Sequence, residues 1–229
     1  MNNRFYFLFI ILITSCSQPS KNTTVSGSIK GLQKGTLYLQ HLKDDEFTTL
    51  DSLQMISKTD FELGCNLEEA ELLFLSLSEK VYAERISFFA DQGHTTINTT
   101  LKRFKYDAQI EGSEQQKLLE SYYKNIERFK NQKLELIEAQ LNAQKEGNSA
   151  AADSLQIKMD KIVQRTYLYS INFALNNKDS EVAPFVAVSE IYDANVKYLD
   201  TINKVLTPKI ANSKYGIILE EYIKTIKSE

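Results

Sequence analysis

The chain has 229 residues, and its 27 basic and 30 acidic side chains give a formal net charge of −3. That balance lacks the basic footprint of a nucleic-acid-binding protein, so we expect no nucleic-acid partner. Glycine (8) and proline (3) are scarce, which predicts long regular elements instead of a loop-rich fold.

Residues 1–16 have the features of a secretory signal. Arg4 precedes an apolar run of about 9–10 residues, which is too short to cross a bilayer as a helix, and small residues follow before Cys16. The stretch Ile-Thr-Ser-Cys at 13–16 resembles a bacterial lipobox. The resemblance implies cleavage before Cys16 and acyl chains on this residue, which together anchor a protein stably. The alternative is an ordinary signal with an incidental cysteine.

The polar residues 17–22 contain Pro19 and suit a flexible tether. No acidic cluster follows Cys16, and such a cluster would resemble a signal for export to the cell surface. We therefore expect a protein of the bacterial cell envelope, lipid-anchored in the outer membrane and facing the periplasm. Its membrane contact would be the lipid on Cys16.

Residues 23–112 carry short runs rich in Thr, Ile, Leu, Phe and Tyr, separated by turn residues and by no helical stretch. This spacing predicts an antiparallel β-sandwich, with an open barrel as the alternative. The expected strands lie at 25–29, 36–42, 48–56, 60–63, 72–77, 85–90, 95–99 and 106–110.

Residues 113–229 change to a helical period, so the fold class we expect is α+β. The first apolar face stops at a break formed by Gly147 and Asn148, and a second face follows, which predicts a long antiparallel helical hairpin. The first helix, about 32 residues, would be roughly 48 Å long, so its tip should project or pack on a partner. The two expected faces are Leu119, Tyr122, Tyr123, Ile126, Phe129, Lys133, Leu134, Ile137 and Leu141, then Leu155, Met159, Ile162, Val163, Thr166, Tyr167, Ser170, Phe173 and Ala174.

Shorter helices are expected after the hairpin. Ser180 is a candidate N-cap for a helix near 182–193, and a second segment at 196–206 ends before Pro208. Ser213 is a candidate N-cap for a last amphipathic helix. The helical region thus extends from residue 113 to residue 229.

The order of short motifs resembles domain of unknown function family 4369. The motifs are Val-Ser-Gly-Ser-Ile at 25–29, Gly-Thr-Leu-Tyr-Leu at 35–39, Leu-Asp-Ser-Leu at 50–53, Asp-Phe-Glu-Leu at 60–63, Thr-Thr-Ile-Asn at 95–98 and Glu-Gly-Ser at 111–113. The stretches at 206–208 and 212–216 resemble the helix that precedes a linker in those proteins. This family forms the N-terminal region of bacterial lipoproteins in which a thioredoxin-like domain with a Cys-x-x-Cys pair often follows. No Cys-x-x-Cys occurs here, so we expect the thioredoxin domain to be missing and carry over no catalytic residue.

Candidate reactive residues are few. With Cys16 lipidated, Cys65 has no intramolecular partner, and we expect a buried thiol; a reactive thiol or an intermolecular disulfide is the alternative. His41 and His94 lack metal-ligand spacing. We therefore expect no metal, no cofactor and no catalytic site.

Three triplets of the form Asp-Ser/Thr-apolar resemble periplasmic O-glycosylation sites of some Gram-negative bacteria. They place candidate acceptor hydroxyls at Ser52, Ser154 and Thr201. The pattern is short enough to arise by chance.

These features favour a membrane-anchored, non-catalytic binding or scaffold module with an envelope protein as a candidate partner, and they identify no small-molecule ligand. Some hairpin aromatics could line a groove for such a partner. The alternative is an accessory or docking partner of a thioredoxin-like thiol–disulfide oxidoreductase, an expectation from family architecture alone. An enzyme whose site is assembled from scattered polar residues is a third class.

Overall fold

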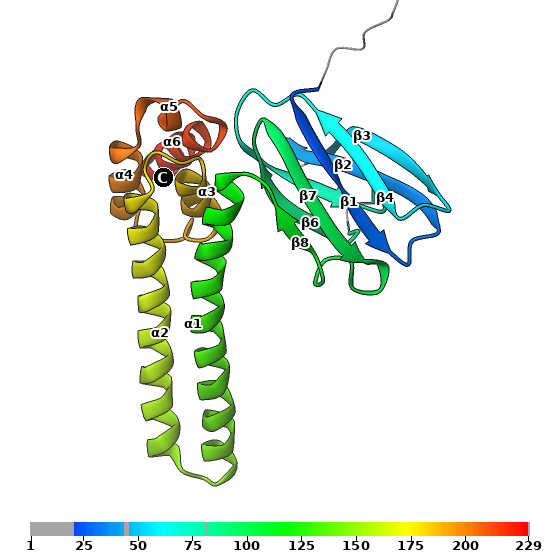
Figure 1. Ribbon diagram of the computed structural model, residues 1–229. Coiled ribbons are helices and arrows are strands. Elements are labelled where there is room, and N and C mark those ends of the chain that lie inside the picture. Colours follow the sequence, from blue (N-terminus) through cyan, green and yellow to red (C-terminus); the bar gives the residue numbers. More distant parts are fainter. Residues whose placement is uncertain (1–20, 44–45, 81, 229) are drawn as a thin grey trace, which may run out of the picture.

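The computed structural model describes residues 21–43, 46–80 and 82–228 (Figure 1). Two four-stranded sheets precede a helical region, so the predicted α+β class is confirmed. The signal and lipobox, with Cys16, lie outside the described residues. The strands are β1 (Thr23–Lys30), β2 (Lys34–Lys43), β3 (Glu46–Ile56), β4 (Asp60–Cys65), β5 (Glu71–Ser76), β6 (Arg85–Ala90), β7 (Gly93–Thr100) and β8 (Gln109–Glu111). The helices are α1 (Glu114–Lys145), α2 (Ser149–Asn176), α3 (Val182–Ser189), α4 (Val196–Val205), α5 (Pro208–Ala211) and α6 (Lys214–Ser228).

The sheets have the strand orders β4-β1-β7-β8 and β3-β2-β5-β6. The expectation of wholly antiparallel sheets was wrong for one pair, because β1 and β7 run parallel from Thr23 opposite Gly93 to Lys30 opposite Thr100. Parallel neighbours need a long crossover, and the intervening strands β2 to β6 supply it. The expected strand at 106–110 is also shorter, since a 3₁₀ turn at Leu101–Arg103 delays β8 to Gln109.

The core of the sandwich lies between the two sheets. Alternate side chains of each strand point inward, as the period of two requires. Gly27 of β1 sits so close to β7 that an added Cβ would lie 1.8 Å from the carbonyl oxygen of Ile97. The fully buried residues include Val25, Ile29, Leu37, Leu39, Leu73, Leu75, Phe88 and Ile97.

Helices α1 and α2 form the predicted antiparallel hairpin, whose tip projects away from the sandwich (Figure 1). The side chain of Ser113 caps α1 by accepting the backbone N–H of Gln116 at 3.1 Å. Gly147, at φ 70°, terminates α1, and Asn148 caps α2. The two helices of the hairpin therefore begin after good N-cap residues, and α1 ends before a glycine, as the sequence predicts.

The predicted apolar face of α1 was wrong in its distal half. Leu134, Ile137 and Leu141 are exposed, with 64% and 52% of Leu134 and Leu141 accessible to solvent. The contact with α2 passes instead through half-buried Leu136 and buried Ala143. Two apolar stripes coexist on this part of α1, and periodicity alone does not distinguish the one that faces a neighbour.

The shorter helices pack at the base of the hairpin around a second core. Helix α3 starts at Val182, with Glu181 and not the predicted Ser180 at its N-cap, although Ser180 Oγ accepts the Val182 N–H at 3.2 Å. Pro208 follows the end of α4 as predicted and then opens the short helix α5. Over the described residues, no helix is both long and apolar enough to span a membrane.

A third core joins the sandwich to the helices. Phe89 of β6 packs edge-on against Phe185 of α3 at 5.4 Å between ring centroids, and against Tyr215 of α6 at 5.7 Å. The Tyr215 hydroxyl also accepts the backbone N–H of Leu72 at 3.0 Å. Buried aromatic pairs of this kind stabilise by about 0.5–1.5 kcal/mol beyond their area. The two halves of the chain are thus held together by packing and by directed hydrogen bonds.

Candidate binding groove

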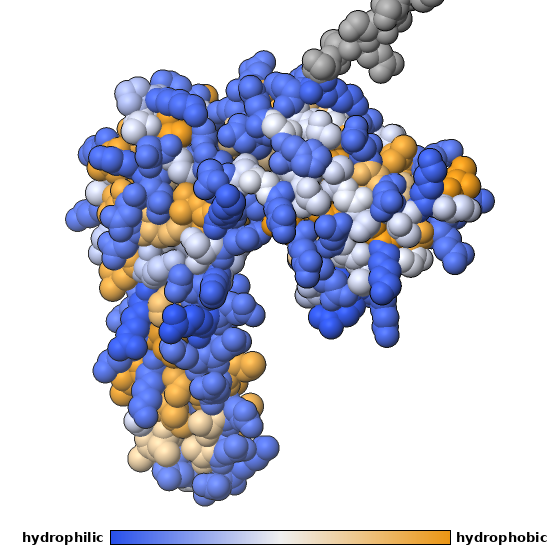
Figure 2. All heavy atoms as spheres, in the orientation of Figure 1, coloured by the Kyte–Doolittle hydropathy of each residue, from blue (hydrophilic) through white to orange (hydrophobic). Residues whose placement is uncertain are grey.

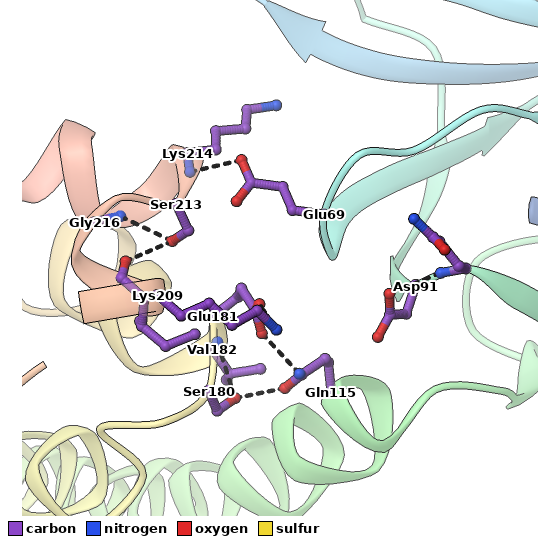
Figure 3. A network of polar contacts seen from close by, with 12 residues as sticks. Glu69, Asp91, Gln115, Ser180, Glu181, Val182, Lys209, Ser213, Lys214 and Gly216 are labelled. Carbon is purple, nitrogen blue, oxygen red and sulfur yellow. Dashed lines mark hydrogen bonds and ion pairs between the residues drawn. The ribbon is translucent and has the colours of Figure 1, made fainter. Parts of the chain in front are cut away.

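A polar network at the base of the hairpin fixes the helices relative to one another (Figure 3). Glu181, only 2% exposed, accepts from Gln115 Nε2 of α1 at 2.7 Å and pairs with Lys209 of α5 at 3.3 Å. Ser180 donates to Gln115 Oε1 at 2.5 Å. This buried carboxylate is satisfied on both oxygens, so we assign the network a structural role: it holds the start of α3 against α1.

The same network extends to the sandwich. The backbone N–H of Lys214, at the start of α6, donates to Glu69 Oε1 at 2.7 Å, and its ammonium group pairs with Glu71. Both acids flank the start of β5. The cluster of short helices is therefore fixed to the sandwich as well as to the hairpin. This cluster includes the turn between α3 and α4.

A groove lies between the outer side of α2 and the turn that precedes α4. Its volume is about 410 Å³, and most of its lining is apolar. Tyr192, in the turn, accepts a hydrogen bond from the Tyr222 hydroxyl of α6 on its carbonyl oxygen at 3.0 Å, which anchors this wall. The groove is lined by Val163, Gln164, Tyr167, Leu168, Ile171, Asp193, Ala194, Asn195 and Tyr198.

One polar pair sets the chemistry of the groove. The Tyr167 hydroxyl donates to Asp193 Oδ1 at 2.6 Å, and this hydrogen bond is the main reason that the pKa of Tyr167 rises to about 12. Tyr167 therefore remains a donor at neutral pH, and the carboxylate keeps its second oxygen for another donor. Asn195 caps α4 through the Lys197 N–H at 3.0 Å and holds the backbone after Asp193 in place.

An apolar trough with one carboxylate at its edge suits a specific kind of ligand. An aliphatic or aromatic group would contact Val163, Leu168 and Tyr198, while a donor or cation next to it would reach Asp193. Ligand pockets combine a mostly apolar lining with a few placed polar groups in this way. Sequence reasoning placed Tyr167 in the hairpin core with the option of lining a groove, but it missed Asp193, which no periodicity brings to that point.

The predicted glycosylation residues lie apart from the groove and from one another. Ser52 is exposed on β3, Ser154 is exposed in the first turns of α2, and Thr201 is exposed on α4. The Thr201 hydroxyl donates to the carbonyl oxygen of Lys197 at 2.7 Å. The structure brings none of the three together, and their modification stays a prediction.

The remaining candidates for reactive chemistry also stay separate. Cys65 is buried, and desolvation, with a smaller contribution from Glu71, raises its pKa to about 11, which disfavours the nucleophilic thiolate. His41 Nδ1 lies 3.6 Å from Glu71 Oε1, whereas His94 contacts the Ser26 hydroxyl on the other sheet. In the described part of the chain, no three His, Cys, Asp or Glu side chains gather as a metal site would need.

A buried arginine was also missed by sequence reasoning. The guanidinium of Arg85 lies 3.6 Å over the Phe47 ring, and its Nε donates to Gln40 Oε1 at 3.1 Å. Two further bonds reach the carbonyl oxygens of Lys80 and Ala83. Arg85 thereby ties the segment before β6 to the outer face of its sheet, which is a structural role.

Comparison with known proteins identifies the N-terminal half. Residues 23–119 match the family model described as Domain of unknown function (DUF4369). No curated protein and no solved structure matches the chain. The matched segment contains both sheets and the first turns of α1, through Leu119. This chain therefore carries a DUF4369 domain at residues 23–119.

Proposed function

We propose that this protein is a non-catalytic binding module of the bacterial cell envelope, anchored through lipid on Cys16, and that the groove beside α2 is its binding site. The single observation that carries this proposal is the groove of about 410 Å³ with the Tyr167–Asp193 pair at its edge. The anchor itself rests on the sequence of residues 1–16.

The walls of the groove support binding by a preformed surface. Ile171, at its floor, is buried among the residues of α4 and α6, and the Tyr222 hydroxyl holds the opposite wall. Side chains held in this way lose little conformational freedom when a ligand binds, which favours affinity. Val163, Leu168 and Tyr198 are exposed where they line the groove.

The chemistry of the lining favours a protein segment that combines an apolar side chain with Lys or Arg. Asp193 would receive the cation, and the tyrosine hydroxyl would keep the carboxylate oriented. A charge-assisted hydrogen bond of this kind is roughly twice as strong as a neutral one. An acidic segment would meet the negative charge of Asp193 and should be rejected.

A fluorescent reporter can test the site, because the chain contains no tryptophan. With Tyr198→Trp as the only indole, peptides that combine Leu or Phe with Lys should change its emission on titration, while the same peptides with Glu for Lys should not. Asp193→Asn in the reporter background should weaken binding of the basic peptides by about tenfold. Asp60→Asn, an exposed acid on β4, is the matched control.

Two results would contradict the proposal. One is the absence of any saturable change in emission with every peptide. The other is equal affinity for the Lys and Glu peptides in the reporter protein, because the carboxylate would then have no part in recognition.

A further inference from the structure

A second surface of α2 faces away from α1, and its C-terminal end, at Gln164 and Leu168, borders the groove. Its residues Ile157, Lys161, Gln164 and Leu168 follow one another at steps of four, three and four, so they form one ridge, here called the outer ridge. Ile157 and Leu168 are 57% and 54% exposed. Figure 2 shows hydrophobic residues among hydrophilic ones along the hairpin.

The charges beside the outer ridge are sorted by sign. Asp153 and Asp160 lie along one edge, and Lys158 and Arg165 lie along the other. All four are exposed, and the ion pairs seen in the described part of the chain include none of them. The only hydrogen bond shown for these carboxylates comes from Gln156 Nε2 to Asp160 Oδ1 at 2.9 Å. An acidic edge and a basic edge thus flank the ridge, and neither forms an ion pair with the residues that the structure describes.

We propose that the outer ridge packs against the outer ridge of a second copy of this chain, with the two α2 helices parallel. In a parallel helix pair, a residue on one edge faces the residue five positions later on the other edge of its neighbour. Asp153 then faces the partner's Lys158, and Asp160 faces the partner's Arg165. Two-fold symmetry doubles this to four opposite-charge pairs.

The sorting of charge also selects the orientation. In an antiparallel pair, symmetry would place each edge against the same edge of the partner. Asp160 would then approach the partner's acidic edge, and Arg165 would approach the basic one. A two-fold axis along α2 also leaves the first described residues of both sandwiches on the same side, away from the hairpin tips (Figure 1). That arrangement suits two chains held on one membrane.

The outer ridge makes a weak and specific contact. Sixteen residues of helix from Asp153 to Leu168 span about 24 Å, well below the size of a standard stable interface. Lys161 and Gln164 occupy the two middle layers, where polar residues lower stability but fix the register. Lys161 can also reach the partner's Asp160. Such a contact is therefore best detected by a covalent crosslink between chains held close together on a membrane.

The test uses a disulfide at the centre of the outer ridge. Gln164→Cys in the full mature chain, oxidised in its membranes, should give an interchain disulfide between the two copies. Residue 164 faces its own counterpart in the parallel pair, whereas in an antiparallel pair centred on the outer ridge it faces residue 161. Asn131→Cys, exposed on α1, is the matched control and should stay monomeric. Non-reducing gels of the purified chain show the dimer directly.

Charge reversal supplies the decisive comparison. In the Gln164→Cys background, Asp153→Lys with Asp160→Lys makes both edges basic, and Lys158→Glu with Arg165→Glu makes both edges acidic. Each variant alone should lose crosslinking by about tenfold, and a mixture of the two should restore it. Circular dichroism of each variant verifies that these exposed substitutions leave the fold intact.

Three outcomes would overturn the proposal. They are no dimer from Gln164→Cys, equal crosslinking in all charge variants, or a crosslink to a different protein in place of a second copy. Because Gln164 and Leu168 also line the groove, Asp193→Asn is tested in the Gln164→Cys background as well. The crosslink should remain, since Asp193 lies outside the outer ridge, and failure here is then distinguishable from failure of the proposed groove.

Discussion

The side-chain oxygen of Gln116 accepts the backbone N–H of Phe89 at 2.8 Å, while the hydroxyl of Ser113 donates to the carbonyl oxygen of the same residue at 2.9 Å. Phe89 belongs to β6, an edge strand of its sheet. Edge strands invite pairing with other chains unless their backbone groups are covered. The first turn of α1 covers this point, and the DUF4369 match, which ends at residue 119, includes this turn.

Replacement of this acceptor should weaken the whole fold. Gln116→Ala leaves the buried N–H of Phe89 without a partner, so we expect the free energy of unfolding to fall by about 1–3 kcal/mol. Urea unfolding followed by circular dichroism measures the loss. Gln132→Ala, at an exposed position of α1, should leave the midpoint unchanged, and equal midpoints for both variants would refute the role of Gln116.

Gly27 should tolerate no side chain. Its φ of 153° and the 1.8 Å approach of Ile97 O to a built Cβ leave no room where β1 and β7 run parallel. We expect Gly27→Ala to destabilise the sandwich by about 3 kcal/mol or more. Gly35→Ala is the control, since its Cβ would meet nothing closer than 3.6 Å. Thermal unfolding of the two variants compares them, and a similar melting temperature would contradict the close approach.

The Cys65 thiol should make the protein less stable in alkali. Its pKa is about 11 in the folded chain and about 9 when exposed, so above pH 9 the unfolded chain releases this proton first. Stability that is present below pH 9 is therefore lost as the pH rises toward 11. Cys65→Ala should reduce this loss by about 2 kcal/mol, measured from urea unfolding at pH 8 and pH 11.

Two observations would count against this account of Cys65. One is an identical pH dependence of unfolding in wild type and Cys65→Ala. The other is rapid labelling of the native thiol by iodoacetamide at pH 8, because a buried thiol with a raised pKa presents little thiolate.

The proposed anchor makes a direct prediction about Cys16. A palmitate analogue supplied to the cells should label the wild-type chain, and Cys16→Ser should lose the label and leave the membrane fraction. Cys65→Ser, the other cysteine substitution, should keep the label. Labelling that survives Cys16→Ser would exclude the lipobox assignment.

The mass of the mature protein tests the three candidate glycosylation residues. We expect a mass above that of polypeptide plus lipid, and a stepwise decrease when Ser52, Ser154 and Thr201 are replaced by Ala one at a time. Ser154 should show the largest occupancy, because its hydroxyl is exposed on a helix that projects from the rest of the chain. A wild-type mass equal to polypeptide plus lipid would remove the prediction.

Local features of the sequence predicted most of the elements. Alternation placed the strands close to their observed bounds, and Gly147 with Asn148 marked the turn of the hairpin. The parallel pairing of β1 with β7 could not be predicted from the sequence, because it depends on which distant strand lies next to Gly27. Hydrogen bonding between strands so far apart leaves no local trace in either one.

The candidate groove shows the same limit. The helical period puts Tyr167 and Leu168 on α2, but the position of Asp193 is set by how α3 docks against Phe89 and Tyr215. The exposed stripe of α1 that contains Leu134 was wrongly predicted to face α2 for a related reason. Periodicity identifies faces, whereas tertiary packing decides which of them is covered.

The base of the hairpin is coupled mechanically to the sandwich. The start of α1 and the end of α2 meet in one aromatic cluster. There the Tyr122 hydroxyl lies 2.8 Å from Ser170 Oγ, and the Tyr122 ring lies 4.9 Å from the Phe173 ring. The same cluster contains Phe89 of the sandwich. A partner that slides α1 along α2 near the tip must therefore strain this cluster and pull on the bond from Phe89 to Gln116. A force applied at the tip of the hairpin would therefore act on the edge of the sheet, where β6 meets the first turn of α1.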